Sequence, residues 1–185
     1  MKINNEALNT NKILGISIVD LGLAFTTCIV IVHLWSIFNL LETIPSWIFR
    51  LTSWEIIGGI SYTQVLAFFE SMLLFGILLF IGILIPKRFY ADKFVVHSAL
   101  FALLISIWAV IIQYNYGVIR TLGGKKLLIL LFLILLSASL ILIIVNRIKK
   151  IDLLIYSVVQ KMAVLGIVYL IIDVLAIFIV IARNL

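Results

Sequence analysis

Five long stretches of almost uninterrupted apolar residues dominate this 185-residue chain. A helix needs about 20 mostly apolar residues to cross the roughly 30 Å hydrocarbon core of a bilayer, whereas a membrane β-strand shows about ten residues of alternating polarity. The stretches here are continuous. They predict an all-α integral membrane protein, a polytopic bundle of about five transmembrane helices. The expected spans are residues 13–38, 65–85, 94–113, 127–145 and 153–182.

The composition excludes several classes of protein. Hydrophobic residues make up 65% of the chain and charged residues 12%, against about 45–50% and about 25% in soluble domains. Too few polar residues remain to cover a soluble exterior, so we expect neither a soluble enzyme nor a nucleic-acid-binding protein. The connecting segments are too short for a second domain, and residues 1–185 are expected to form a single transmembrane domain.

Two segments are expected to depart from simple spans. Residues 39–62 mix charges and Trp residues around Pro45, which predicts one interfacial helix at headgroup depth. Gly58 and Gly59 are expected to break that helix before the second span begins. The fifth apolar stretch is longer than a span requires, so it is either one long helix or an interfacial helix near residues 151–159 followed by a span.

Basic residues in the connecting segments predict the orientation, because cytoplasmic loops carry an excess of Lys and Arg. One side collects eight: Lys2, Lys12, Lys87, Arg88, Lys93, Arg147, Lys149 and Lys150. The other side collects five: Arg50, Arg120, Lys125, Lys126 and Arg183. We therefore expect a cytoplasmic N-terminus and an external C-terminus in a cell membrane, which in a prokaryote is the plasma membrane.

Four ionisable residues fall inside the predicted spans, where each charge costs about 2.5–3.5 kcal/mol on insertion scales and normally faces protein or water. They are Asp20, Glu70, Lys161 and Asp173. Asp20 and Lys161 lie toward the same end of their spans and are a possible intramembrane ion pair. The alternative is that Lys161 extends to the headgroups and Asp20 reaches water.

Glu70 and Asp173 are the candidates for ion or proton binding. Asp173 belongs to a helical seam of small and polar residues that should point into the bundle: Met162, Gly166, Tyr169, Asp173 and Ala176. Nothing on its own helix satisfies Glu70, so partners are sought at similar depth in His33, Gln113 and Tyr114. Carboxylates with a histidine at low dielectric can hold a proton or a cation. The alternative is a hydrogen-bonded clamp between helices.

The sequence offers little for cofactors, metals or catalysis. His33 and His97 lie near opposite ends of their spans, about 25 Å apart at 1.5 Å per residue, too far to share a haem iron. The lone Cys28 excludes a cysteine-rich zinc site. The usual hydrolase, metalloprotease and phosphate-loop motifs are also missing. We therefore expect no cofactor, no metal and no enzymatic activity.

Ser98, Ala102 and Ser106 recur every four residues in the third span. Such a stripe lets another helix approach closely, either within the chain or in a partner. The sequence thus favours a non-catalytic integral subunit or anchor of a larger membrane complex. The alternative is an oligomeric small transporter or ion or proton pathway that uses intramembrane carboxylates. The expected partners are the lipid bilayer and another membrane subunit or a second copy, with no nucleic acid.

Overall fold

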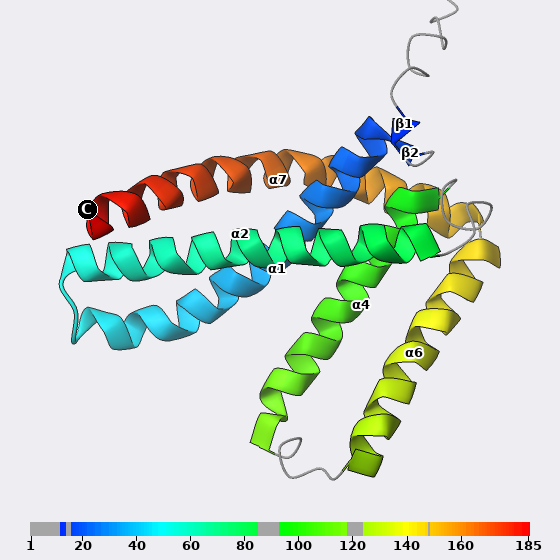
Figure 1. The fold of residues 1–185 in the computed structure, drawn as a ribbon, viewed down its shortest axis with the longest axis horizontal. Coiled ribbons are helices and arrows are strands. Elements are labelled where there is room, and N and C mark those ends of the chain that lie inside the picture. The colour runs from blue at the N-terminus through cyan, green and yellow to red at the C-terminus, as the bar shows by residue number, and fades with distance from the viewer. Residues whose placement is uncertain (1–11, 14–15, 85–92, 118–123, 148) are drawn as a thin grey trace, which may run out of the picture.

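The computed structural model describes residues 12–13, 16–84, 93–117, 124–147 and 149–185, and it is helical almost throughout. A two-residue hairpin of β1 (Lys12–Ile13) and β2 (Ile16–Ser17) precedes the helices. The helices are α1 (Ile18–Ile48), α2 (Ser53–Leu84), α4 (Phe94–Tyr114), α6 (Gly124–Arg147) and α7 (Lys149–Asn184), coloured along the chain in Figure 1. Of the basic residues used to predict orientation, Lys2, Lys87, Arg88 and Arg120 lie outside the described residues.

The predicted all-α fold is confirmed. Helices α1, α2, α4 and α7 are long and apolar enough to cross a bilayer. Helix α6 covers the predicted fourth span, but the apolar stretch found among its described residues, Leu128–Leu140, is shorter than a full span. The fifth apolar stretch is one continuous helix and not an interfacial helix followed by a span.

The predicted interfacial helix at residues 39–62 is absent from the described structure, where residues 39–48 continue α1 and residues 53–62 begin α2. The reason is local. Glu55 accepts hydrogen bonds from the backbone N–H and the hydroxyl of Thr52, at 2.7 and 2.8 Å, which caps the start of α2 ahead of the glycines. The helix then runs on through Gly58 and Gly59.

The glycine pair makes room for neighbours and does not end a helix. A Cβ at Gly59 would lie 2.9 Å from the indole of Trp47 in α1, and a Cβ at Gly58 would overlap the guanidinium of Arg183 in α7. The small residues therefore let α1 and α7 close against the first turns of α2. Gly58 and Gly59, which predicted a helix break, instead permit close packing between helices.

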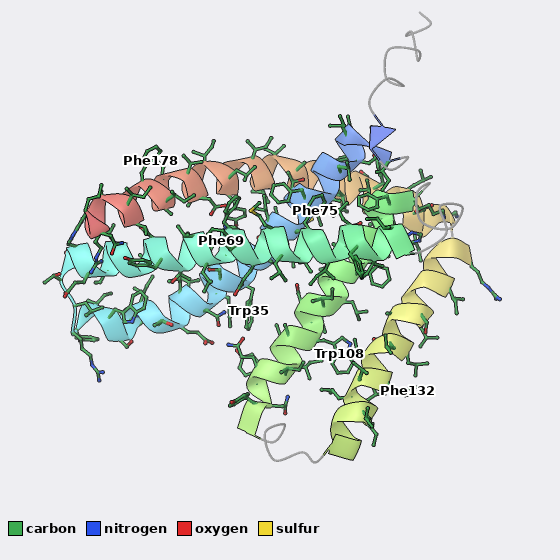
Figure 2. The ribbon with its side chains drawn as sticks, viewed as in Figure 1. Trp35, Phe69, Phe75, Trp108, Phe132 and Phe178 are labelled. Carbon is green, nitrogen blue, oxygen red and sulfur yellow. The ribbon has the colours of Figure 1, made fainter. Side chains whose placement is uncertain are left out.

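Helices α1, α2 and α7 pack against one another, with α1 crossing α2 obliquely, and α4 and α6 slope away from α2 and α7 (Figure 1). Helix α4 buries its first half, including Phe94, Val95 and Ala99, against α1 and α7. Ala102 joins a cluster with Cys28 of α1 and Leu78 of α2. Farther along α4, Trp108 lies on the side that faces α6, and its indole N–H donates to Ser137 Oγ of α6 (Figure 2).

Helices α1 and α7 run parallel. Thr26 of α1 lies against Gly166 of α7. Seven positions later in both helices, His33 of α1 bonds to Asp173 of α7. Because Arg183 near the end of α7 contacts the first turns of α2, α2 runs antiparallel to both. The end of α7 therefore lies beside the connection between α1 and α2 (Figure 1).

Candidate functional site

His33 of α1 and Asp173 of α7 form a buried pair inside the three-helix core. The imidazole Nε2 lies 2.8 Å from the carboxyl Oδ1, and the two side chains are 0% and 2% exposed. The pair joins residues 140 positions apart in the chain. Asp173 reaches this place on the predicted seam of α7, where Gly166, Asp173 and Ala176 are buried and Met162 and Tyr169 are half-buried.

The hydrogen bonds assign a proton to this pair. His33 Nδ1 lies 2.9 Å from the Ile29 carbonyl oxygen, and since a carbonyl only accepts, Nδ1–H is the donor. The other nitrogen, Nε2, faces Asp173 Oδ1. One proton must lie between them, on imidazolium or on carboxylic acid, because otherwise a lone pair would face a carboxylate in a buried site. With this proton the pair is neutral overall, and without it a net negative charge is buried.

Tyr169 and Gly166 hold the pair in place. The Tyr169 ring stacks on His33 with ring centroids 5.0 Å apart and planes inclined by 25°, which fixes the plane of the imidazole. Two helical turns earlier, a Cβ at Gly166 would lie 2.7 Å from the Thr26 Cβ. The glycine therefore brings the backbones of α1 and α7 close enough for the short aspartate side chain to reach the histidine.

Further buried polar atoms lie on the three helices of this core. Within the described part of the chain, Asp173 Oδ2, Ser36 Oγ and Gln64 Oε1 have no hydrogen-bond partner. Gln64 and Ser61 of α2 line a cavity of about 180 Å³ against the α7 segment that includes Ile172 and Ala176, the neighbours of Asp173. Buried polar atoms without partners are uncommon in proteins, and they mark functional regions or bound water.

The other ion-binding candidates lie elsewhere. Glu70 is exposed on α2, and Gln113 and Tyr114 are exposed at the far end of α4. The ring of Tyr114 reaches Trp35, with centroids 6.5 Å apart, and not His33. Of the five residues proposed to share a site, the structure brings together His33 and Asp173. Gln113 and Tyr114 lie at the far end of α4, which diverges from α1 (Figure 1), and the exposed Glu70 lies outside the core.

Asp20 and Lys161 do not meet in the structure. Among the described residues the ion pairs are His33–Asp173 and Lys93–Asp152, the latter with 2.6 Å between Nζ and Oδ2. Asp20 is half-buried and lines a pocket of about 190 Å³ beside Lys93 and Asp152, whereas Lys161 is exposed on α7. Sequence reasoning missed the Lys93–Asp152 pair because both residues lie at helix starts, where charges are common.

The stripe of small residues on α4 is partly buried within the protein. Ser98 and Ala102 are buried and Ser106 is half-buried. His97 is also buried, at 1% exposure. The first half of α4 packs on α1. This contact within the chain covers Ser98 and Ala102, for which the sequence also allowed contact with a partner helix. Ser106 lies farther along, where it lines an apolar groove of about 500 Å³ with Trp35 and Phe38.

Comparisons with protein-family models, with curated proteins and with solved structures find no match to this chain. Its class therefore follows from its own structure. The fold is all-helical, with four helices in the described part of the chain long and apolar enough to cross a bilayer, which is the architecture of an integral membrane protein. Its most distinctive internal feature is the buried His33–Asp173 pair.

Proposed function

We propose that this protein binds a proton within the membrane at the His33–Asp173 pair and acts as a small proton pathway or proton-linked transporter. The observation that carries the proposal is the geometry of the buried pair, in which His33 Nε2 lies 2.8 Å from Asp173 Oδ1. His33 Nδ1 donates to the Ile29 carbonyl, so a proton must lie between Nε2 and Asp173 Oδ1. Intramembrane Asp and His residues commonly serve as proton relays.

Three features support a working site over a purely structural clamp. Asp173 Oδ2 has no partner among the described residues, so the carboxyl group keeps a free position for a second hydrogen bond. The cavity beside Gln64 reaches the same stretch of α7. The Tyr169 ring stacks on the imidazole and holds the plane of the His33 ring in one orientation toward Asp173. A clamp would need only the Nε2 to Oδ1 bond.

The test is proton flux into vesicles. The purified protein is reconstituted in vesicles that contain a pH-sensitive dye, and a potassium gradient with valinomycin drives proton entry. We expect Asp173→Asn to lower the flux at least tenfold while the protein stays folded, because the asparagine amide can donate to Nε2 without carrying an ionisable proton. The control is Asp20→Asn, which removes a carboxylate from α1 outside the pair.

Either of two results would contradict the proposal: wild-type flux equal to that of empty vesicles, or full flux in Asp173→Asn. A second readout is the ¹⁵N resonance of His33 Nε2, which should move from the shared-proton position toward that of a hydrogen-bond acceptor in Asp173→Asn. The chain has two histidines, so His97→Gln assigns the spectrum.

A second candidate function is a non-catalytic integral subunit or anchor of a larger membrane complex, and we propose no enzymatic activity for either role. The observation that favours it is Glu70, an exposed carboxylate on α2. The mass of the intact assembly, purified from native membranes in mild detergent, tests this role. A different protein at fixed stoichiometry supports it. A monomer or a homo-oligomer would contradict it.

A further inference from the structure

Glu70 occupies an unusual position on the outer surface of the bundle. It lies near the middle of α2 and is exposed, and it makes no hydrogen bond or ion pair with the described residues. Its neighbours at helical spacing are also exposed and apolar, with Leu66 at 59% and Leu73 at 66%. We call this surface the Glu70 face and define it by five residues: Leu66, Phe69, Glu70, Leu73 and Ile77.

A carboxyl group in this place requires a partner from outside the chain. Glu70 lies about 25 Å from the start and about 21 Å from the end of α2 at 1.5 Å per residue, so apolar turns of the helix flank it on both sides. Acidic residues within spans almost always face protein or water, because a charge in hydrocarbon is costly. The opposite side of α2, which includes Ala67, Ser71 and Leu74, already packs into the core.

A second copy of this chain does not supply a matching cation. Gly58 of α2 lies beside Arg183 of α7, and the two helices are antiparallel, so Glu70 is level with residue 171 of α7. The exposed intramembrane lysine, Lys161, lies ten residues farther along, about 15 Å away in depth. Copies with the same orientation keep each residue at its own depth, so Lys161 of another copy stays out of reach of Glu70.

We infer that the Glu70 face binds a transmembrane helix of another protein that carries a Lys or Arg at the depth of Glu70. The charges are complementary, and the flanking Leu66, Phe69 and Leu73 supply the packing surface for the helix. This inference rests on the second candidate function, because it names the surface and the chemistry of the partner that a subunit role requires. It is independent of the proton site at His33 and Asp173, which lies inside the bundle.

The test uses the full-length protein, labelled with a fluorophore, in vesicles of phosphatidylcholine and phosphatidylglycerol. The probe is a transmembrane Leu-Ala peptide with one central Lys, and its matched partner has Leu at that position. Energy transfer should show that the Lys peptide binds about 3- to 20-fold more tightly than the Leu peptide, the range measured for polar contacts between membrane helices. Glu70→Gln should remove this difference.

Two controls define the site. Glu42→Gln removes an exposed glutamate near the end of α1 and should leave peptide binding unchanged. A peptide with Lys moved seven residues toward one end should bind like the Leu peptide. Equal binding of the Lys and Leu peptides, or an unchanged difference in Glu70→Gln, would overturn the inference. Energy transfer between two labelled copies that is lost in Glu70→Gln would also overturn it, because the face would then bind a second copy.

Failure here is distinguishable from failure of the two functional proposals. Asp173→Asn should abolish proton flux and leave peptide binding unchanged. If the protein purifies from native membranes with a different protein and Glu70→Gln preserves that complex, the subunit role stands and the Glu70 face is the wrong surface.

Discussion

Gly166 of α7 lies so close to Thr26 of α1 that a Cβ on the glycine would be 2.7 Å from the Thr26 Cβ and 3.1 Å from the Thr26 carbonyl oxygen. Seven residues farther along both helices, His33 and Asp173 form their buried hydrogen bond. Because seven residues are about two helical turns, the same faces of the parallel helices carry both contacts. The glycine contact sets the helix separation at which the histidine and the aspartate meet.

Gly166→Ala should therefore destabilise the protein by about 1–3 kcal/mol, because the added methyl group meets the Thr26 Cβ and backbone, which cannot rotate away. The measurement is thermal unfolding in detergent. The matched control is Gly22→Ala in α1, where a Cβ would have no neighbour within 4 Å. That variant should be neutral or more stable by up to about 1 kcal/mol, since alanine favours a helix. Equal effects of the two variants would argue against the close contact.

His33→Ala should cost about 1–3 kcal/mol of stability, because it leaves the buried Asp173 carboxyl group without its hydrogen bond. Asp173→Asn should stay within about 1 kcal/mol of the wild type, since its amide can still donate to Nε2. Denaturant or thermal unfolding of both variants in the same detergent measures the difference. If Asp173→Asn is as unstable as His33→Ala, the proton assignment between Nε2 and Oδ1 fails.

Gly58 and Arg183 should show coupled effects. Arg183 donates to the carbonyl oxygens of Trp54 and Glu55, at 3.2 and 3.4 Å, and its guanidinium occupies the space beside Gly58. In the wild type, Gly58→Ala displaces the guanidinium, and the lost hydrogen bonds offset the gain in helix propensity. In Arg183→Ala the same substitution should stabilise by about 1 kcal/mol. Thermal unfolding of this double-mutant cycle checks the coupling, and an identical effect in both backgrounds would contradict it.

Ser137→Ala should loosen α6 from α4. The indole N–H of Trp108 donates to Ser137 Oγ at 3.2 Å, which links the two helices. The expected loss is about 0.6–1.7 kcal/mol, the range for hydrogen bonds between membrane helices. Ser139→Ala is the control, because the exposed Ser139 hydroxyl bonds only to the Leu136 carbonyl of its own helix. Indole fluorescence during unfolding should move for the first variant and remain at its wild-type value for the second.

The parallel arrangement of α1 and α7 predicts which sites share a membrane side. In a Cys28→Ala background, Arg50→Cys and Leu185→Cys should both react with an impermeant maleimide added outside intact cells, if the C-terminus is external as the basic residues predict. Lys150→Cys, at the start of α7, should react only after permeabilisation. Labelling of Arg50→Cys and Leu185→Cys from opposite sides would contradict the arrangement of the helices.

Much of the local structure could be predicted from the sequence, because helix formation in a membrane depends on apolar length and on the helical period. The predicted spans lie within or close to the observed helices, and the seam of Gly166, Asp173 and Ala176 is buried as expected. The separate helix expected over residues 39–62 is not observed, because α1 and α2 share this segment. The prediction used the charges and glycines of this segment, whereas the start of α2 is set by the hydrogen bonds between Thr52 and Glu55.

The sequence by itself determined the class of protein, the approximate helices and the inward face of α7, since these follow from patterns within about 30 neighbouring residues. Only the tertiary structure decided that Asp173 meets His33 and that Glu70 faces outward. The helical period fixes which residues share a face, but it does not say which helix packs against that face. That choice depends on contacts between distant segments, such as Gly166 against Thr26 and Arg183 over Gly58.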